Sequence, residues 1–286
     1  PPFFFYQHQT ESAILSGLVG SEMCIRDSQI QALENAVWTH VDDDFHYLGS
    51  MPYDFHMDAE FAHAMKDNCE KRGLEARTVE YEGFPIDTND PATIRNVARL
   101  LHQLHSAPEV PGVFNLPAVI DDYIATAKRF NVTHPDKLSE ALEFSAKIIS
   151  AMGSCEKVSA PCHNDLLPAN FLQSRDQLYL LDWEYAGMGL PYVDLGNCAV
   201  NFCMDKTACT IFMESYLGRK PSTAEMAQLH LLRVLSDLRE AMWAYVQIGI
   251  STLDVDFHAY GMKHLNRFLQ NAKSTELQNW LKVLEG

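Results

Sequence analysis

The chain has 286 residues, 47% of them hydrophobic and 21% charged, and its formal net charge is −16 at pH 7. This length and apolar content suit one or two hydrophobic cores, and the lack of any run of about 18 apolar residues predicts no membrane span. The acidity argues against a nucleic-acid partner, because binding to phosphate backbones requires a basic face.

The cysteines are informative about the class of protein. Seven of them are scattered along the chain between Cys24 and Cys209, and no two form a CxxC pair. This spacing predicts neither a disulfide framework nor a zinc site. We therefore interpret them as buried thiols of a cytoplasmic protein.

The first segment in chain order is residues 1–28. Within it, LVGSEMCIRDS at 18–28 resembles a conceptual translation of the transposase adapter used in short-read sequencing. We therefore expect residues 1–28 to be an adapter artefact and not a domain, and we leave them out of the fold prediction. A signal peptide is the alternative, but no basic region precedes the apolar stretch at 13–20 and no small-residue cleavage site follows it.

Residues 29–89 are strongly acidic, with 13 acidic and 4 basic residues. A helix-like run covers 58–72, and TVEYEG follows it at 78–83. Near the start of the segment lie two histidines and two aspartates, His40, Asp42, Asp44 and His46. An acidic surface loop is the simplest interpretation of this stretch.

A helix is predicted to begin at Asn89-Asp90-Pro91, where a capping side chain is followed by proline in the first turn. Apolar residues follow at helical spacing as far as about His105, namely Ile94, Val97, Ala98, Leu101 and Leu104. The pattern predicts further helices at residues 117–130, 135–152, 202–217, 223–250 and 256–273. Asp136 and Ser139 are the alternative start signals for the helix in 135–152.

Between these helices lies the segment that indicates chemistry. His163-Asn164-Asp165 is followed by Asn170, and Asp182 ends a short apolar strand. Apolar residues at 171–172 and 178–181 flank a polar turn, which predicts a β-hairpin that brings Asp182 back beside Asn170. Phosphoryl transfer from ATP needs one carboxylate that accepts the hydroxyl proton, and an amide oxygen and a second carboxylate that hold magnesium. These residues are of the right types.

The stretch CHNDLLPANFLQSRDQLYLLDWEYAGMGLPYVDLGN at 162–197 resembles the choline/ethanolamine kinase branch of the aminoglycoside phosphotransferase superfamily. The resemblance implies an α+β, protein-kinase-like fold in which residues 90–286 form a mainly helical C-terminal lobe with a catalytic β-hairpin. It also implies ATP and Mg²⁺ as cofactors. It implies that His163 and Asp165 form the catalytic HxD pair, with Asp165 as the base. Asn170 and Asp182 are implied as magnesium ligands, and Asn170 as part of the catalytic set. Asp194 is implied to brace the catalytic loop and to cap the next helix.

The acceptor pocket is predicted from the same resemblance, which extends to residues 236–269. A quaternary ammonium is best recognised by aromatic faces and nearby carboxylates. Tyr185 matches a choline-pocket tyrosine of the family, and Glu184, Trp243 and Tyr245 are candidates to complete the pocket. For Trp243 and Tyr245 the alternative is packing in a helical core.

Charged residues in the same C-terminal stretch have a simpler interpretation. Asp237, Arg239 and Glu240 are expected to form a solvated or salt-bridged helix face, not a set of substrate ligands.

Residues 29–89 do not contain the expected nucleotide clamp. A kinase amino lobe supplies a glycine-rich loop and a strand lysine, but the segment has no close glycine pair, and Lys66 and Lys71 lie in the helix-like run. One interpretation is an incomplete amino lobe with 78–83 as strand and hinge, because the kinase family has a similar strand ending in Glu-Gly there. The other is a chimera, because residues 38–58 and 76–88 resemble an extradiol dioxygenase of the protocatechuate or aminophenol type. That resemblance implies an iron site at His40, Asp42, Asp44 and His46, since two histidines and a carboxylate suit non-haem iron.

Two classes of function follow from the sequence. The first is a small-molecule kinase acting on the hydroxyl of choline, ethanolamine or a similar amino alcohol, with an aminoglycoside or thiamine as the alternative acceptor. The second is a non-catalytic, truncated or chimeric kinase fragment that keeps the metal ligands but lacks the ATP clamp.

Overall fold

The computed structural model describes residues 84–285, except 111, 154, 156, 157, 175, 176, 184, 252 and 254. The predictions for residues 1–28, the iron-site interpretation and the strand at 78–83 lie outside the described residues. The described elements, in chain order, are β1 (Phe84–Pro85), α4 (Pro91–His105), α5 (Leu116–Arg129), α6 (Leu138–Met152), β2 (Ala160–Cys162), η1 (Pro168–Asn170), β3 (Phe171–Ser174), β4 (Gln177–Leu180), β5 (Gly187–Gly189), α7 (Pro191–Asn201), α8 (Lys206–Leu217), α9 (Thr223–Ile250), α10 (Phe257–Ala272) and α11 (Thr275–Glu285).

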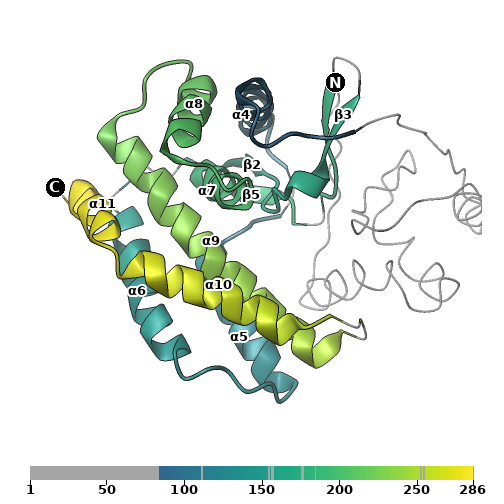
Figure 1. Ribbon diagram of the computed structural model, residues 1–286, viewed down its shortest axis with the longest axis vertical. Helices are drawn as coiled ribbons and strands as arrows, with labels where there is room; N and C mark the ends of the chain where they lie inside the picture. Colours follow the sequence, from purple (N-terminus) through teal and green to yellow (C-terminus); the bar gives the residue numbers. More distant parts are fainter. Residues whose placement is uncertain are drawn as a thin grey trace, which may run out of the picture.

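The long helix α9 organises the described part of the chain. Figure 1 shows α9 running diagonally through it, with α5 and α6 on one side and α4, α7 and α8 on the other. Helices α10, α7, α5 and α11 all pack against α9. Two small antiparallel sheets, β1-β3-β4 and β2-β5, complete the architecture. The expected mainly helical lobe with a β-hairpin is therefore confirmed.

Helix α4 forms where its local signals predict. The carboxylate of Asp90 accepts hydrogen bonds from the backbone N–H groups of Ala92 and Thr93, and Pro91 occupies the first turn. All of the apolar residues that showed helical spacing are buried, namely Ile94, Val97, Ala98, Leu101 and Leu104. Because α4 contributes to the core along its whole length, its C-terminal His105 is carried into the interior beside the catalytic loop.

The predicted hairpin is also present. Strands β3 and β4 pair in antiparallel register, with Phe171 opposite Leu180 and Leu172 opposite Tyr179. The backbone N–H of Leu181 then donates to the backbone oxygen of Asn170 over 2.8 Å. Asp182 therefore follows directly after a residue that is hydrogen-bonded to Asn170, as the sequence predicted.

Three helix predictions were inaccurate. Helix α6 begins at Leu138 without a side-chain cap, so neither Asp136 nor Ser139 starts it. The helix predicted at 202–217 begins only at Lys206, because the chain turns through Cys203, whose φ is +50°. Helix α11 was not predicted at all. The first two errors arise where apolar residues continue through a turn or where capping is absent, so the periodic pattern does not mark the boundary.

Two hydrophobic clusters meet at α7. The first lies mainly among α5, α6, α9, α10 and α11, and the second among α4, β3, α7 and α8. Val193 of α7 belongs to the first cluster and Leu195 to the second. A Cβ on Gly196 would lie 2.6 Å from the backbone nitrogen of Arg233, so glycine is what allows α7 to approach α9 this closely. Within the described part, every helix is too short or too polar to span a membrane.

Candidate active site

His163 holds the catalytic loop in place through hydrogen bonds to the backbone. His163 is fully buried, its Nε2 lies 2.8 Å from the backbone oxygen of Leu181, and its Nδ1 lies 3.2 Å from the backbone nitrogen of Asp165. These partners require a proton on Nε2 and an acceptor lone pair on Nδ1. His163 therefore ties Asp165 to the strand that leads to Asp182. These contacts are those of a residue that positions the loop, and the catalytic role that the resemblance implied for His163 stays a prediction.

Asn164 gives the loop its sharp turn. Its φ is +69°, in the left-handed region that asparagine tolerates better than most residues. Its Nδ2 donates to the backbone oxygen of Tyr185 over 2.9 Å and to that of Cys162 over 3.3 Å. The side chain thus fixes both the loop and the segment after Asp182.

Asp194 braces the loop, as predicted. Its two carboxylate oxygens accept the backbone N–H groups of His163, over 2.8 Å, and of Asn164, over 2.6 Å, and His105 Nε2 lies 3.1 Å away. Burial alone raises the pKa of Asp194, but the hydrogen bond and charge of His105 and the contacts with His163 hold it below its usual value. The predicted helix-capping role was wrong, since Asp194 lies within the first turn of α7 and its carboxylate binds the loop.

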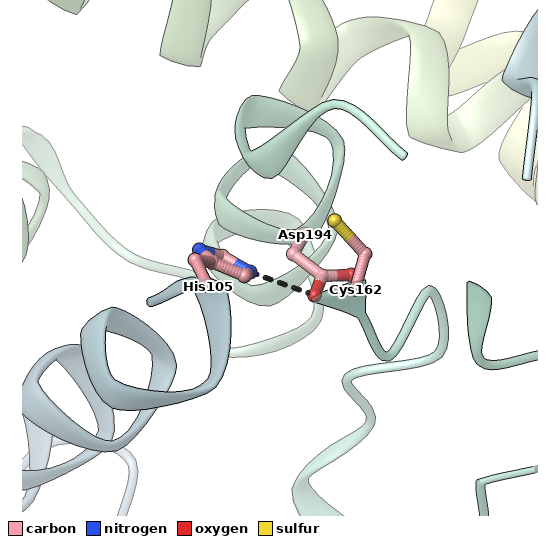
Figure 2. A group of neighbouring side chains, drawn as sticks. All are labelled: His105, Cys162 and Asp194. Carbon is pink, nitrogen blue, oxygen red and sulfur yellow. Dashed lines mark hydrogen bonds and ion pairs between the residues drawn. The ribbon is translucent and has the colours of Figure 1, made fainter. Parts of the chain in front are cut away.

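His105, Cys162 and Asp194 come from α4, β2 and α7 and converge in the interior (Figure 2). Their ligand atoms lie within 4.8 Å of one another, a grouping that is compatible with a metal ion. Both Asp194 oxygens, however, already accept hydrogen bonds from the loop, and burial raises the pKa of the Cys162 thiol well above its usual range. We therefore interpret this group as a structural brace.

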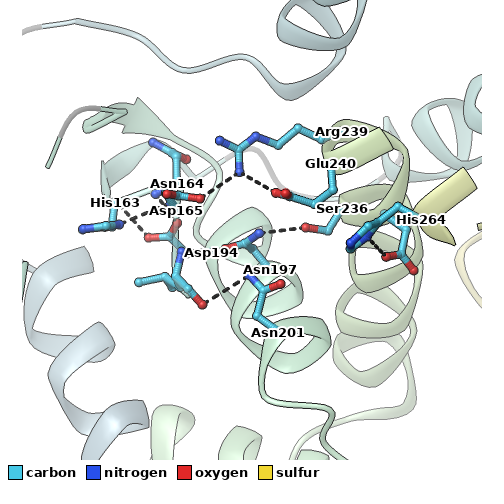
Figure 3. A network of polar contacts seen from close by, with 12 residues as sticks. His163, Asn164, Asp165, Asp194, Asn197, Asn201, Ser236, Arg239, Glu240 and His264 are labelled. Atoms are coloured by element: carbon cyan, nitrogen blue, oxygen red, sulfur yellow. Dashed lines mark hydrogen bonds and ion pairs between the residues drawn. The ribbon is translucent and has the colours of Figure 1, made fainter. Parts of the chain in front are cut away.

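Helix α7 presents a second set of loop contacts that sequence reasoning missed. Asn197 Oδ1 accepts the backbone N–H of Leu166 over 2.6 Å, and Asn197 Nδ2 donates to Ser236 of α9 over 2.9 Å. Asn201 Nδ2 donates to the backbone oxygen of Leu166 over 3.3 Å. Figure 3 shows Asp194, Asn197 and Asn201 along one side of α7, as their spacing of three and seven residues requires. That polar spacing is the signal that would have identified Asn197.

Asn170 and Asp182 have the chemistry of a magnesium site. Asn170 is fully buried and its Nδ2 donates to the backbone oxygen of Asp165 over 2.9 Å, which leaves its buried Oδ1 without a hydrogen-bond partner. Asp182 is 7% exposed and has a φ of +61°, a strained conformation of the kind that is often found at functional sites. An orphaned amide oxygen and a carboxylate are ligand types that fit a hard cation such as Mg²⁺.

Arg239 of α9 reaches the predicted base. Its Nη1 lies 3.3 Å from Asp165 Oδ1 and 3.3 Å from Glu240 Oε1, as Figure 3 shows. The other oxygen of Glu240 accepts a hydrogen bond from Tyr260 over 3.2 Å. Burial opposes the charge of Arg239, but Tyr123, Glu240 and Asp165 more than compensate and raise its pKa. The buried guanidinium therefore stays charged.

The expectation of a solvated helix face was wrong in one respect. Asp237, Arg239 and Glu240 do form ion pairs, but they are 0%, 4% and 8% exposed and therefore belong to the interior. Asp237 is held by Arg267 and His264 of α10. Charged residues within a helix that is otherwise apolar are the signal in the sequence that could have indicated this burial.

Three of the four predicted acceptor residues, Tyr185, Trp243 and Tyr245, lie within the described residues. Tyr185 lies beneath the guanidinium of Arg239, with 4.9 Å between Cζ and the ring centre. Trp243 contacts Phe257 and Tyr260 edge to face. Tyr245 is 1% exposed and packs against His134, so it belongs to the core, the alternative considered for it, and we do not propose it as a substrate contact. Glu184 lies outside the described residues, and so do residues 29–83, in which the sequence showed no glycine-rich loop or nucleotide-binding lysine.

Comparison with curated proteins gives similarities of two kinds. A probable ethanolamine kinase of Arabidopsis thaliana is 26% identical over 224 residues, which cover 68% of this chain and 59% of that protein. The 2-aminophenol 1,6-dioxygenase alpha subunit of Pseudomonas sp. is 45% identical over 49 residues, 17% of this chain and 18% of that subunit. The second similarity is to a dioxygenase, the class of enzyme that residues 38–58 and 76–88 resemble. That residues 29–89 are chimeric stays a prediction.

The kinase similarity extends to solved structures. A choline/ethanolamine kinase family protein from Mesorhizobium loti has a TM-score of 0.66 and 25% identity, over 73% of each chain. This likeness confirms the kinase-like fold. The chain spans about half to three fifths of the length of the curated kinase relatives. Residues 62–232 match the family described as the phosphotransferase enzyme family, and because this match covers more than half of the sequence, the chain belongs to that family.

Proposed function

We propose that this chain carries the acceptor and metal sites of an ATP-dependent phosphotransferase that acts on the hydroxyl of choline, ethanolamine or a similar amino alcohol. The observation that supports this most strongly is that Asn170 is hydrogen-bonded both to Asp165 and to Leu181, the residue before Asp182. The similarity to an ethanolamine kinase and to a choline/ethanolamine kinase family structure supports the choice of acceptor.

Each residue has a distinct part in the proposed reaction. The Asp165 carboxylate accepts the proton of the acceptor hydroxyl as its oxygen attacks the terminal phosphorus of ATP. Asn170 and Asp182 would hold the magnesium bound to ATP, which supplies the positive charge that balances the transferring phosphoryl group. Asp194 and Asn197 hold the loop in place, so that Asp165 is already oriented when the acceptor binds.

The test is a coupled ADP-release assay on a version in which residues 1–83 are replaced by the amino lobe of the Mesorhizobium loti relative. Asp165→Asn should lower kcat by on the order of 10²–10⁴ with little change in the KM for ATP, because it removes the proton acceptor and not the phosphate contacts. Asp182→Ala should instead abolish productive binding of magnesium and ATP.

Asp121→Asn, the same chemical change at an exposed position on α5, is the matched control and should leave kcat unchanged. Near-normal turnover in Asp165→Asn would exclude Asp165 as the base. Preference for an aminoglycoside or thiamine over every amino alcohol would overturn the proposed acceptor class.

A further inference from the structure

The face of Tyr185 that was predicted to hold a substrate cation is already covered by a cation of the protein. The guanidinium carbon of Arg239 lies 4.9 Å from the centre of the Tyr185 ring and 5.8 Å from that of Phe114. Arg239 is only 4% exposed, so this position is built into the fold. A quaternary ammonium at the same ring face would meet both the bulk and the like charge of Arg239.

The same guanidinium is shared by two carboxylates. Its Nη1 contacts Asp165 Oδ1 and Glu240 Oε1, each over 3.3 Å, and Tyr260 donates to Glu240 Oε2. When both carboxylates are ionised, the single arginine leaves a surplus of one negative charge. The two carboxylates approach one common nitrogen, so they are close enough for a two-carbon amino alcohol to bridge them.

A primary ammonium fits this arrangement better than a quaternary one. A primary ammonium has three N–H donors that carboxylate oxygens can accept, whereas a quaternary ammonium has none and depends on aromatic faces. Of the aromatic candidates, Tyr185 carries Arg239, Trp243 packs against Phe257 and Tyr260, and Tyr245 lies in the core.

We propose that Arg239 and Glu240 make this site selective for acceptors with a primary ammonium, which Glu240 binds while the acceptor hydroxyl faces Asp165. Both residues lie beyond the segment 62–232 that defines the family, so the family match does not itself assign them. The inference rests on the proposed function, since it concerns the acceptor of that reaction. It makes Glu240 a determinant of acceptor specificity and Arg239 the residue that blocks the aromatic site.

Acceptor binding can be measured separately from phosphoryl transfer. Isothermal titration of the full 286-residue chain, without nucleotide and at pH 8, would compare ethanolamine, its N-methyl and N,N-dimethyl derivatives, and choline. Burial raises the pKa of Glu240, so the titration is run above neutral pH, which shifts this carboxyl toward its ionised form. The affinity should fall with each added methyl group, and choline should bind at least tenfold more weakly than ethanolamine. Choline binding as tight as that of ethanolamine, or no binding by any of the four amines, would overturn the proposal.

Variants then assign the preference to Glu240. Glu240→Gln should weaken ethanolamine at least tenfold and leave choline within about twofold, whereas Glu214→Gln, the same change at an exposed position on α8, should alter neither. An equal loss for both amines would show a merely structural role and contradict the proposal. If Glu240→Gln does not fold, the wild-type amine series still decides the matter, and Tyr260→Phe tests the support of Glu240. If the chain binds amines selectively but the version with the replaced amino lobe releases no ADP, the proposed function is refuted and the proposed amine selectivity is not.

Discussion

Asp194 shows how much of this site depends on one buried carboxylate. It is 0% exposed, and it accepts two backbone N–H groups of the catalytic loop in addition to its contact with His105. The Nδ1 atom of His105 lies 2.8 Å from the hydroxyl of Tyr216, so the brace continues into α8. The orientation of the loop that carries Asp165 therefore depends on residues from three helices.

We expect Asp194→Asn to lower the free energy of unfolding by about 3–5 kcal/mol, because it leaves buried donors without a charged acceptor. The pKa of Asp194 is held below 3.8 in the folded protein. A carboxylate with a depressed pKa stabilises the fold at higher pH, and this contribution is lost as the pH falls below that value. Urea unfolding at pH 7 would measure the difference.

The matched control for this substitution is Asp122→Asn, which changes an exposed aspartate of α5. Asp122→Asn should change the free energy of unfolding by less than about 0.5 kcal/mol. A similarly small effect at Asp194 would mean that the loop is held without the brace.

At the scale of elements, α9 begins with a well-formed capping box. The Ser222 hydroxyl accepts the backbone N–H of Glu225 over 3.2 Å, and the Glu225 carboxylate accepts the backbone N–H of Ser222 over 2.7 Å. Arg219 adds two hydrogen bonds to the same carboxylate. The start of the longest helix is thus defined by residues in its first turn and just before it.

We expect Glu225→Ala to destabilise the fold by about 1 kcal/mol at pH 7, the usual scale for a lost cap. The hydrogen bond from Arg219 lowers the pKa of Glu225 to about 2, against the effect of burial. The extra stability of the wild type over Glu225→Ala should therefore be complete above pH 4.5 and disappear as the pH falls through about 2. Thermal unfolding from pH 7 to pH 2 would follow it, with Glu143→Ala on α6 as the exposed control. A pH-independent difference would contradict the assignment to the carboxylate.

At the scale of the whole molecule, the two hydrophobic clusters draw on residues between Ile94 and Leu281. The C-terminal lobe can therefore form its own core. The family match begins at residue 62, whereas the predicted clamp residues were not found in 29–89. Positioning and electrostatic stabilisation supply nearly all the catalysis of phosphoryl transfer, so a lobe without a clamp is expected to be slow.

For the 286-residue chain as it stands, we expect amine-dependent ADP release no faster than that of its Asp165→Ala variant. The measurement is the coupled assay with ethanolamine and with choline. Turnover clearly above the Asp165→Ala control would show that residues 29–89 supply a working nucleotide clamp. That outcome would also contradict the interpretation of this segment as foreign sequence.

The sequence alone determined the features that depend on short-range signals. The start of α4 at Pro91 follows from the Asp90 cap, and its buried face follows from helical spacing. The hairpin follows from two apolar runs around a polar turn, and it sets Asp182 near Asn170. Each of these needs only residues within about 15 positions of one another.

Only the tertiary structure decided the environment of Asp165. Arg239 lies 74 positions away in the chain, and it reaches Asp165 only because α9 packs against α7 and α7 holds the loop. The sequence pattern predicts that charged residues on a helix face solvent, whereas here Arg239 and Glu240 are buried and Arg239 pairs with both Glu240 and Asp165. Tyr245 and Trp243 share one helix, yet their positions around its axis place one in the core and the other beside Tyr260, a difference that is set by what packs against each face.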